Sequence, residues 1–174
     1  MSKPIGHFIN GVDVDDSNRP GPVYNPATGE LTRHVAMASK AMVEDAIAAA
    51  EAAFPAWRDT PPAKRARIMF RFKALLEEHA EEIAAAITDE HGKVFDDAMG
   101  EFGRGVEVVD YACGIPELLK GEYSRNVGPG IDSWSDFQPL GVVAGITPFN
   151  FPAMVPMWMY PMAIACGNTF VLKP

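Results

Sequence analysis

The sequence has few cysteines and no recognisable leader segment. Cys113 and Cys166 are the two cysteines among 174 residues, so no C-x-x-C redox or zinc pair is present and a disulfide framework is excluded. The first eleven residues hold one lysine, an early proline and no apolar run, which gives no sign of a targeting peptide. Reduced thiols suit a cytosol-like compartment, and we expect a cytoplasmic protein.

Basic residues are also scarce. Lys and Arg total 15 against 23 Asp and Glu, a net charge of -8, so there is no basic surface to hold a nucleic acid backbone. Neither standard phosphate loop, G-x-G-x-x-G or G-x-x-x-x-G-K-[ST], occurs. No pair of histidines has metal-ligand spacing, so we expect no metal site and assign all four to surface or capping positions: His7, His34, His79 and His91.

Charge is absent from one long stretch. From Leu140 to Leu172 there is no charged residue, and Lys173 ends the run. A stretch of this length suggests a membrane span, but prolines at four positions interrupt any continuous helix there. We therefore expect a buried parallel-sheet segment rather than a membrane anchor.

The N-terminal part predicts a hairpin, a loop and two helices. Asn10-Gly11 between apolar residues favours a type I′ turn, and prolines and glycine indicate a loop over 15–30. Ser39 is placed to cap a helix that should end near Pro55. Thr60, followed by Pro61, should cap a second helix that continues to Gly92, with its charged face in solvent.

A third helix is expected from about Val94 to Ile115, where Pro116 should stop it. It contains three glycines, each of which weakens a helix by about 1 kcal/mol relative to alanine. We expect close packing or the approach of a ligand at these positions, which are Gly100, Gly103 and Gly105.

The C-terminal part predicts a second hairpin and a β-α-β unit. Strands over 122–127 and 131–138 flank Gly128-Pro129-Gly130. A short apolar strand over 141–146, a helix over 153–165 and a strand over 169–172 then form a right-handed parallel unit of an α/β fold. A doubly wound sheet needs further units, so we expect the chain to be the N-terminal piece of a longer protein.

The loop between the first parallel strand and its helix holds the strongest candidate residue. Ligands bind at the carboxyl ends of strands in such sheets, and Asn150 lies there between Pro148 and Pro152. Its amide would suit a developing oxyanion. The alternative is that Asn150 caps the following helix, and spacing alone favours that alternative.

Several motifs together resemble the aldehyde dehydrogenase superfamily. GITPFNFP at 145–152 and GNTFVLKP at 167–174 match its P-[FW]-N-[FY]-P loop and G-N-x-x-x-x-K-P strand end. FING at 8–11, YNPATG at 24–29 and FPAW at 54–57 extend the likeness over the chain. The segments 131–145 and 154–162 look most like CoA-acylating methylmalonate-semialdehyde dehydrogenases.

This resemblance implies roles for five residues. Asn150 matches the oxyanion-stabilising asparagine, Lys173 the lysine that contacts the adenosine ribose of NAD, and Thr147 and Phe149 positions against the dinucleotide. Without the motif, Lys173 would be a solvated strand-end residue. Arg104 matches an arginine near the substrate carboxylate, for which a guanidinium fork is suited, while a surface salt bridge remains open.

The resemblance also implies a reaction and a domain plan. The intact protein would convert methylmalonate semialdehyde, CoA and NAD to propanoyl-CoA, CO₂ and NADH. In the family that it resembles, the nucleophilic cysteine and the general-base glutamate come at positions beyond residue 174.

 The isolated 174-residue chain should therefore be inactive. Neither Cys166 nor Cys113 should be the nucleophile, because both lie in apolar helical sequence and fit buried structural thiols.

The expected plan has three parts. Residues 1–121 form an N-terminal hairpin and the helical part of the cofactor domain, 122–139 an antiparallel oligomerisation hairpin, and 140–174 the first unit of a Rossmann-like NAD-binding sheet. The partners implied are a small aldehyde, CoA and further copies of the chain in a tetramer, with no nucleic acid or membrane. Two alternatives stay open: a dehydrogenase that hydrolyses its thioester with water, and a non-catalytic module for nucleotide binding or assembly.

Overall fold

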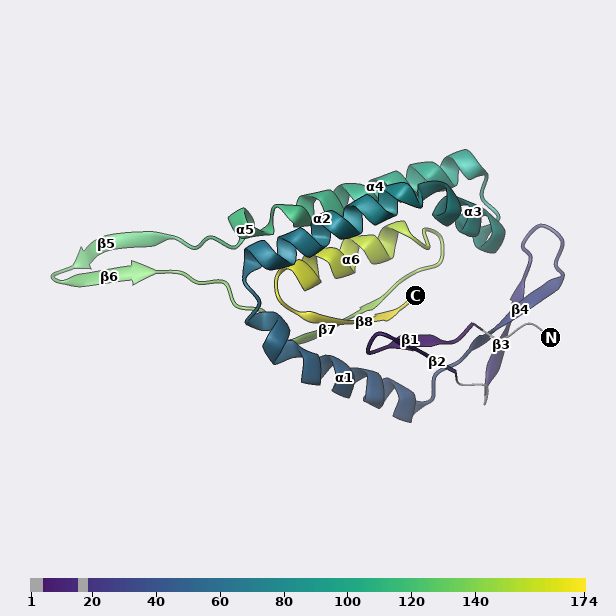
Figure 1. The fold of residues 1–174 in the computed structure, drawn as a ribbon, viewed down its shortest axis with the longest axis horizontal. Coiled ribbons are helices and arrows are strands. Elements are labelled where there is room, and N and C mark those ends of the chain that lie inside the picture. Colours follow the sequence, from purple (N-terminus) through teal and green to yellow (C-terminus); the bar gives the residue numbers. More distant parts are fainter. Residues whose placement is uncertain (1–4, 16–18) are drawn as a thin grey trace.

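The computed structural model describes residues 5–15 and 19–174 and has an α/β architecture. A parallel two-stranded sheet lies between helix α1 on one side and helix α6 on the other, and further helices cover α6 (Figure 1). The elements of this layered body are β7 (Val142–Ile146), β8 (Thr169–Lys173), α1 (Lys40–Arg58), α6 (Met154–Ala165), α2 (Pro62–Glu78), α3 (Ala80–His91), α4 (Phe95–Cys113) and α5 (Ile115–Leu118).

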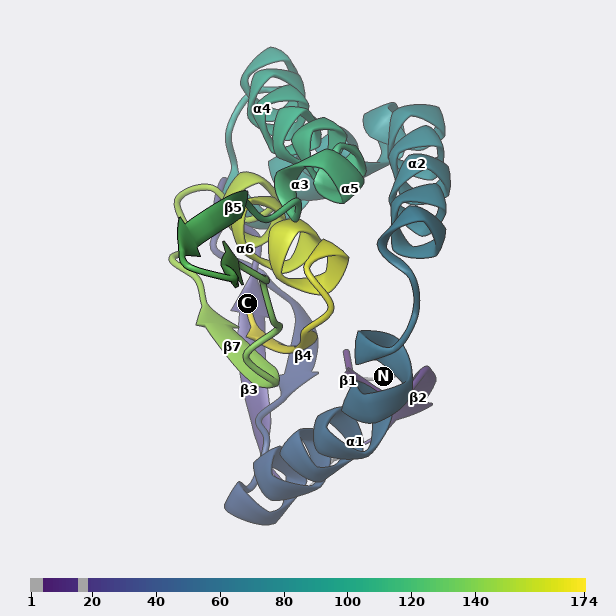
Figure 2. The same cartoon turned by 90° about the vertical axis from the view of Figure 1, so that its left-hand side faces the viewer.

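Three antiparallel hairpins complete the chain. They pair β1 (His7–Ile9) with β2 (Val12–Val14), β3 (Pro20–Tyr24) with β4 (Leu31–Ala36), and β5 (Tyr123–Gly128) with β6 (Ile131–Trp134). The last of these projects away from the helices (Figure 1), and Figure 2 views the molecule from that side, with α6 between α4 and α1.

The first and third hairpins were predicted, and the second was not. Asn10 and Gly11 have φ angles of 52° and 78°, the two positive values that a type I′ turn needs. The expectation of a loop over 15–30 is wrong over Pro20–Tyr24, which pairs with Leu31–Ala36. Proline is tolerated there because each strand of a two-stranded hairpin is an edge strand. Residues 16–18 of the expected loop and residues 1–4 of the N-terminus lie outside the described residues.

The ends of the first two helices differ from the prediction. Ser39 caps α1 as expected, since its Oγ accepts from the Met42 N–H at 3.2 Å. Pro55, however, lies inside α1, which continues to Arg58, because a proline near a helix end removes one backbone donor without blocking the last turn. Thr60 is not an N-cap: its hydroxyl donates to the Ala56 carbonyl at 2.9 Å and so closes α1.

The expected helix from residue 60 to Gly92 is two helices. The backbone breaks at His79, between α2 and α3, and Gly92 ends α3 with a φ of 85°. The third predicted helix, α4, ends at Cys113, and Pro116 lies in the first turn of the short α5 instead of stopping α4. A continuous apolar stripe does not show such breaks, because α2 and α3 can both face the same core.

The charge-free segment forms the predicted β-α-β unit. Strands β7 and β8 pair in parallel, from Val142 opposite Thr169 to Ile146 opposite Lys173, and α6 connects them. This confirms the parallel-sheet interpretation of the segment over a membrane anchor. In the part of the chain that the structure describes, no helix is both long and apolar enough to cross a bilayer.

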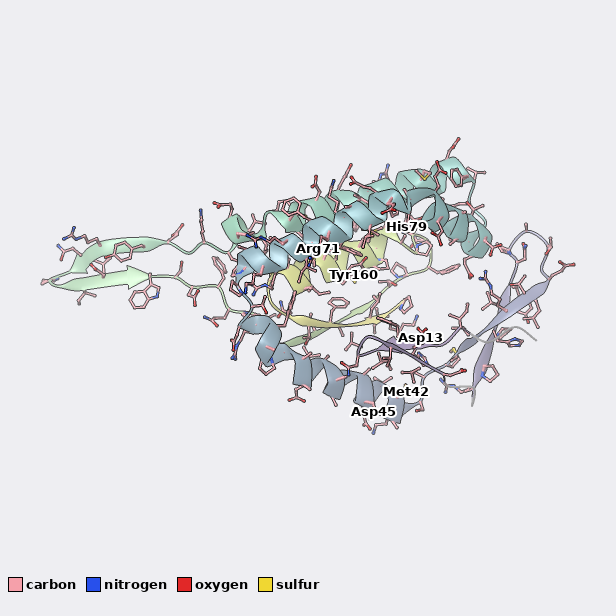
Figure 3. All side chains as sticks on the ribbon, viewed as in Figure 1. Asp13, Met42, Asp45, Arg71, His79 and Tyr160 are labelled. Carbon is pink, nitrogen blue, oxygen red and sulfur yellow. The ribbon has the colours of Figure 1, made fainter. Side chains whose placement is uncertain are left out.

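Close packing fixes α6 between its neighbours. A Cβ added at Gly105 of α4 would overlap the Met157 side chain, whereas Gly100 and Gly103 face open space, so the packing explanation holds for Gly105 alone. Tyr160 of α6, labelled in Figure 3, meets the ring of Phe72 at 6.0 Å and that of Phe170 at 6.4 Å. These aromatic contacts join α2, α6 and β8 into one core.

Candidate functional site

The carboxyl ends of β7 and β8 lie side by side. Ile146 is opposite Lys173 in the parallel register, and the Thr147 N–H donates to the Lys173 carbonyl at 3.1 Å. Thr147 is buried, while the Lys173 side chain is exposed. Two residues 26 positions apart in sequence thus meet at the edge of the sheet where ligands bind in open α/β folds.

Asn150 lies in the loop that leaves this edge. Its residue is exposed, and within residues 5–15 and 19–174 its side-chain amide has no hydrogen-bond partner. The alternative that Asn150 caps α6 is wrong, because the first N–H groups of that helix are bonded to another residue. The amide therefore remains available to donate to a ligand.

Phe149, in the same loop, is 63% exposed and packs its ring 5.5 Å from that of His91. His91 and His7 are half-buried, whereas His34 and His79 are exposed. The side chain of His79 contacts Glu82 at 2.9 Å. No cluster of three or more potential metal-ligating side chains occurs among the described residues.

Glu101 is the residue that sequence reasoning missed. It comes from α4, its side chain is 0% exposed, and its Oε1 accepts from the N–H groups of Ala153 at 2.8 Å and Met154 at 3.1 Å. A carboxylate at this position satisfies the free donors of α6 and suits the positive end of its dipole. A signal was present: Glu101 falls on the apolar stripe that contains Ala98, Phe102 and Gly105.

Lys93 joins this carboxylate to the loop. Its Nζ lies 2.5 Å from Glu101 Oε2 and donates to the Asn150 carbonyl at 3.2 Å. The ammonium group is also 4.4 Å from the centre of the Phe151 ring. With its side chain 13% exposed, Lys93 makes a largely buried ion pair directly beneath the Asn150 loop.

Arg104 lies one turn further along α4 and is exposed. In the described part of the chain it forms no side-chain hydrogen bond or ion pair, so the surface salt bridge considered as its alternative role is not formed. The structure does not bring Arg104 into contact with Asn150.

The two thiols are packed rather than activated. Cys113 is buried on α4, and burial raises the pKa of its thiol. Burial also raises the pKa of the half-buried Cys166, while the nearby Arg65 guanidinium acts in the opposite direction. Nothing in the sequence marks Arg65 as a neighbour of Cys166, so only the fold shows this cation.

 

Arg65 and Ala165, the residue before Cys166, are 100 positions apart in sequence, and the fold brings them together through a 2.8 Å hydrogen bond. Arg65 is almost fully buried, and its guanidinium also donates to the carbonyls of Thr60 and Arg58. These contacts hold the C-terminal end of α6, at the opposite end of the helix from Glu101.

The residues at the sheet edge suit the ribose of a dinucleotide better than its pyrophosphate group. The exposed ammonium group of Lys173 is able to donate to ribose hydroxyl groups. The start of α6, which in many α/β proteins would bind a phosphate, has two of its N–H groups occupied by Glu101. A pyrophosphate group therefore has no free donors at these two positions.

Comparisons with known proteins point to one family. The profile of the aldehyde dehydrogenase family matches residues 13–174. A malonate-semialdehyde dehydrogenase from Pseudomonas aeruginosa is 64% identical over 170 residues, which cover 98% of this chain and 34% of the relative. A mitochondrial protein from Dictyostelium discoideum, named as an acylating methylmalonate-semialdehyde/malonate-semialdehyde dehydrogenase, is 51% identical over 96% of this chain and 32% of its own length.

Solved structures give the same result. The methylmalonate-semialdehyde dehydrogenase of Oceanimonas doudoroffii superposes with a TM-score of 0.98 at 67% identity, covering 99% of this chain and 36% of that one. A protein from Sinorhizobium meliloti, described as a methylmalonate-semialdehyde dehydrogenase and solved with NAD, has a TM-score of 0.96 at 50% identity, covering 100% of this chain and 36% of that one. The chain thus spans about a third of the length of the relatives it matches.

Proposed function

Because this chain belongs to the aldehyde dehydrogenase family, we propose that its 174 residues are the N-terminal part of an NAD-dependent, CoA-acylating semialdehyde dehydrogenase. The substrate proposed is methylmalonate semialdehyde, with propanoyl-CoA, CO₂ and NADH as the products. The names of the relatives support a semialdehyde of malonate or methylmalonate, and the Dictyostelium name supports acyl transfer.

The observation that carries this proposal is the position of Asn150. Its amide, which has no hydrogen-bond partner in the described part of the chain, lies in a loop bounded by Pro148 and Pro152 at the carboxyl edge of β7. In the proposed reaction a thiolate adds to the aldehyde carbon, and the carbonyl oxygen gains negative charge. A donor fixed at that point stabilises the transition state more than the ground state, as in an oxyanion hole.

Three residues at the same edge are proposed to hold NAD. Lys173 donates to the adenosine ribose, and Thr147 and Phe149 line the path of the dinucleotide. NAD supplies the hydride acceptor of the reaction. The exposed guanidinium of Arg104, which has no ion-pair partner among the described residues, is proposed to bind the substrate carboxylate.

The nucleophile and the general base are proposed to come from the rest of the full-length protein. Burial raises the pKa of both Cys113 and Cys166, the opposite of what an attacking thiol needs. The parallel sheet also has two strands with unpaired outer edges in the described residues. We therefore expect the isolated 174-residue chain to be inactive and poorly soluble.

Assembly is proposed to use the β5–β6 hairpin. It projects from the body of the molecule (Figure 1) and exposes large apolar side chains, among them Tyr123, Val127, Ile131 and Trp134. Surface of this kind favours contact with another copy. In this plan 1–121 is the N-terminal hairpin and helical part, 122–139 the assembly hairpin of a tetramer, and 140–174 the first unit of the NAD-binding sheet.

The proposal is tested with Asn150→Ala in the full-length protein. Loss of the donor should lower kcat by about 10²- to 10³-fold with little change in NAD affinity. Single-turnover NADH formation measures the hydride step, and Arg71→Ala at an exposed position of α2 is the control. An unimpaired hydride step in Asn150→Ala would refute the oxyanion role.

Acyl transfer is tested by product analysis. With CoA present, the proposed enzyme should release an acyl-CoA and CO₂, whereas a hydrolytic aldehyde dehydrogenase would release the free acid at the same rate with or without CoA. Formation of free acid alone would remove the CoA-acylating assignment and leave the Asn150 role intact.

A further inference from the structure

The Asn150 loop has few bonds of its own to hold it. Pro148 and Pro152 lack N–H groups, and Pro148, Phe149 and Asn150 are exposed. A backbone bond ties Thr147 to Lys173 at the start of the loop, and another ties Phe151 to Val155 at 3.3 Å. The backbone at Asn150 is held from outside the loop, by the donation from Lys93 Nζ to its carbonyl.

Glu101 holds Lys93 and α6 with separate oxygens. Oε2 contacts Lys93 Nζ, and Oε1 accepts from Ala153 and Met154 at the start of α6. The carboxylate therefore fixes both the helix after the loop and the ammonium group that bonds the loop itself. Because the Glu101 side chain is fully buried, this arrangement has little freedom to move.

We propose that Lys93 and Glu101 are positioning residues that aim the Asn150 amide at the reacting carbonyl oxygen. This inference rests on the proposed oxyanion role of Asn150. A displacement of about 1 Å in a catalytic group can reduce a rate on the order of 10²-fold, so loss of one anchor should reach the chemistry. The competing explanation is that the pair only stabilises the fold, as buried ion pairs can do.

The test uses a double variant in the full-length protein. Lys93→Met alone would leave a buried, unpaired carboxylate and so destabilise the protein whichever explanation holds. In Lys93→Met/Glu101→Gln no charge remains, and the glutamine oxygen can still accept from the N–H groups of α6. The bond to the Asn150 carbonyl is lost, while the helix cap is retained.

Positioning predicts that the double variant remains folded and loses about 10- to 100-fold in the single-turnover rate, with NAD affinity little changed. Lys93→Arg, which keeps a cationic donor, should retain more of the rate than Lys93→Met. Backbone amide exchange at Phe149–Phe151, measured without cofactor, should be faster in the double variant than in the parent protein. A double variant that forms NADH at the parent single-turnover rate would overturn the proposal.

A matched control uses a second Lys–Glu pair. Lys73 and Glu77 form a 2.7 Å ion pair on α2, far from Asn150 in the sequence and partly exposed. Lys73→Met/Glu77→Gln makes the same chemical change and should leave the rate and the loop exchange unchanged. An equal loss of rate in this control would assign the effect to general destabilisation.

Adding Asn150→Ala separates the failure of this inference from failure of the proposed function. If the pair acts through Asn150, the Lys93→Met/Glu101→Gln changes should cost little further rate once Asn150 is alanine. Full additivity would overturn positioning while leaving the oxyanion role in place. A normal rate in Asn150→Ala alone would instead refute the proposed function.

Discussion

Helix α6 carries no charged residue, and its two ends are held by charged side chains from different helices. At the N-terminal end, Glu101 of α4 accepts from the first N–H groups, and at the C-terminal end Arg65 of α2 donates to the Ala165 carbonyl at 2.8 Å. Both charges match the helix dipole. A charge-free segment can therefore be buried because neighbouring helices supply the charges that its ends need.

The two ends differ in what lies next to them. The N-terminal anchor continues through Lys93 to an exposed loop with a candidate catalytic amide. At the C-terminal end, the anchoring residue Arg65 is almost fully buried. The ring N–H of Trp57 also holds this end, since it donates to the Ile164 carbonyl at 2.9 Å. One end thus serves the site and the other the core, and variants at each should separate rate from stability.

The largest effect on stability is expected at the C-terminal end. Arg65→Met would leave the carbonyls of Ala165, Thr60 and Arg58 without this donor, and should lower the free energy of unfolding by about 3 kcal/mol. Urea unfolding of the full-length protein measures the change. Arg71→Met, at an exposed position of α2 labelled in Figure 3, is the control and should change it by less than about 0.5 kcal/mol.

A smaller effect is expected along the middle of α6. Gly105→Ala adds a Cβ that overlaps Met157 and should destabilise the protein by about 1–3 kcal/mol. Gly103→Ala on the same helix adds a Cβ in open space and should stabilise by about 0.5–1 kcal/mol. Equal thermal unfolding shifts for the two variants would contradict the packing of α4 against α6 at Gly105.

The smallest effect expected is a pH dependence of the free energy of unfolding, which comes from the two thiols. Burial raises the pKa of Cys166 and Cys113, so the unfolded chain loses these protons at a lower pH than the folded chain. The stabilisation is present below the ordinary thiol pKa of about 8.5 and is lost as pH rises above it. Unfolding at several pH values checks this, and Cys166→Ala should flatten the decline.

Much of the fold followed from local chemistry in the sequence. The Asn10-Gly11 turn and the Ser39 cap depend on residues within a few positions of one another, and both were predicted. The β3–β4 hairpin was missed because its prolines are typical of loops and are tolerated on an edge strand. The break at His79 was missed because one apolar stripe spans both helices.

By itself, the sequence determined that the charge-free segment forms a parallel β-α-β unit, because prolines and short apolar runs exclude a membrane helix. It also placed Asn150 in the loop after the first strand and Lys173 at the end of the second. Tertiary structure alone decided what holds that unit in place. Glu101 is 52 positions from Ala153, Lys93 is 57 from Asn150 and Arg65 is 100 from Ala165. No local pattern encodes such pairings, since they arise when α2 and α4 pack against α6 and bury charges at its ends.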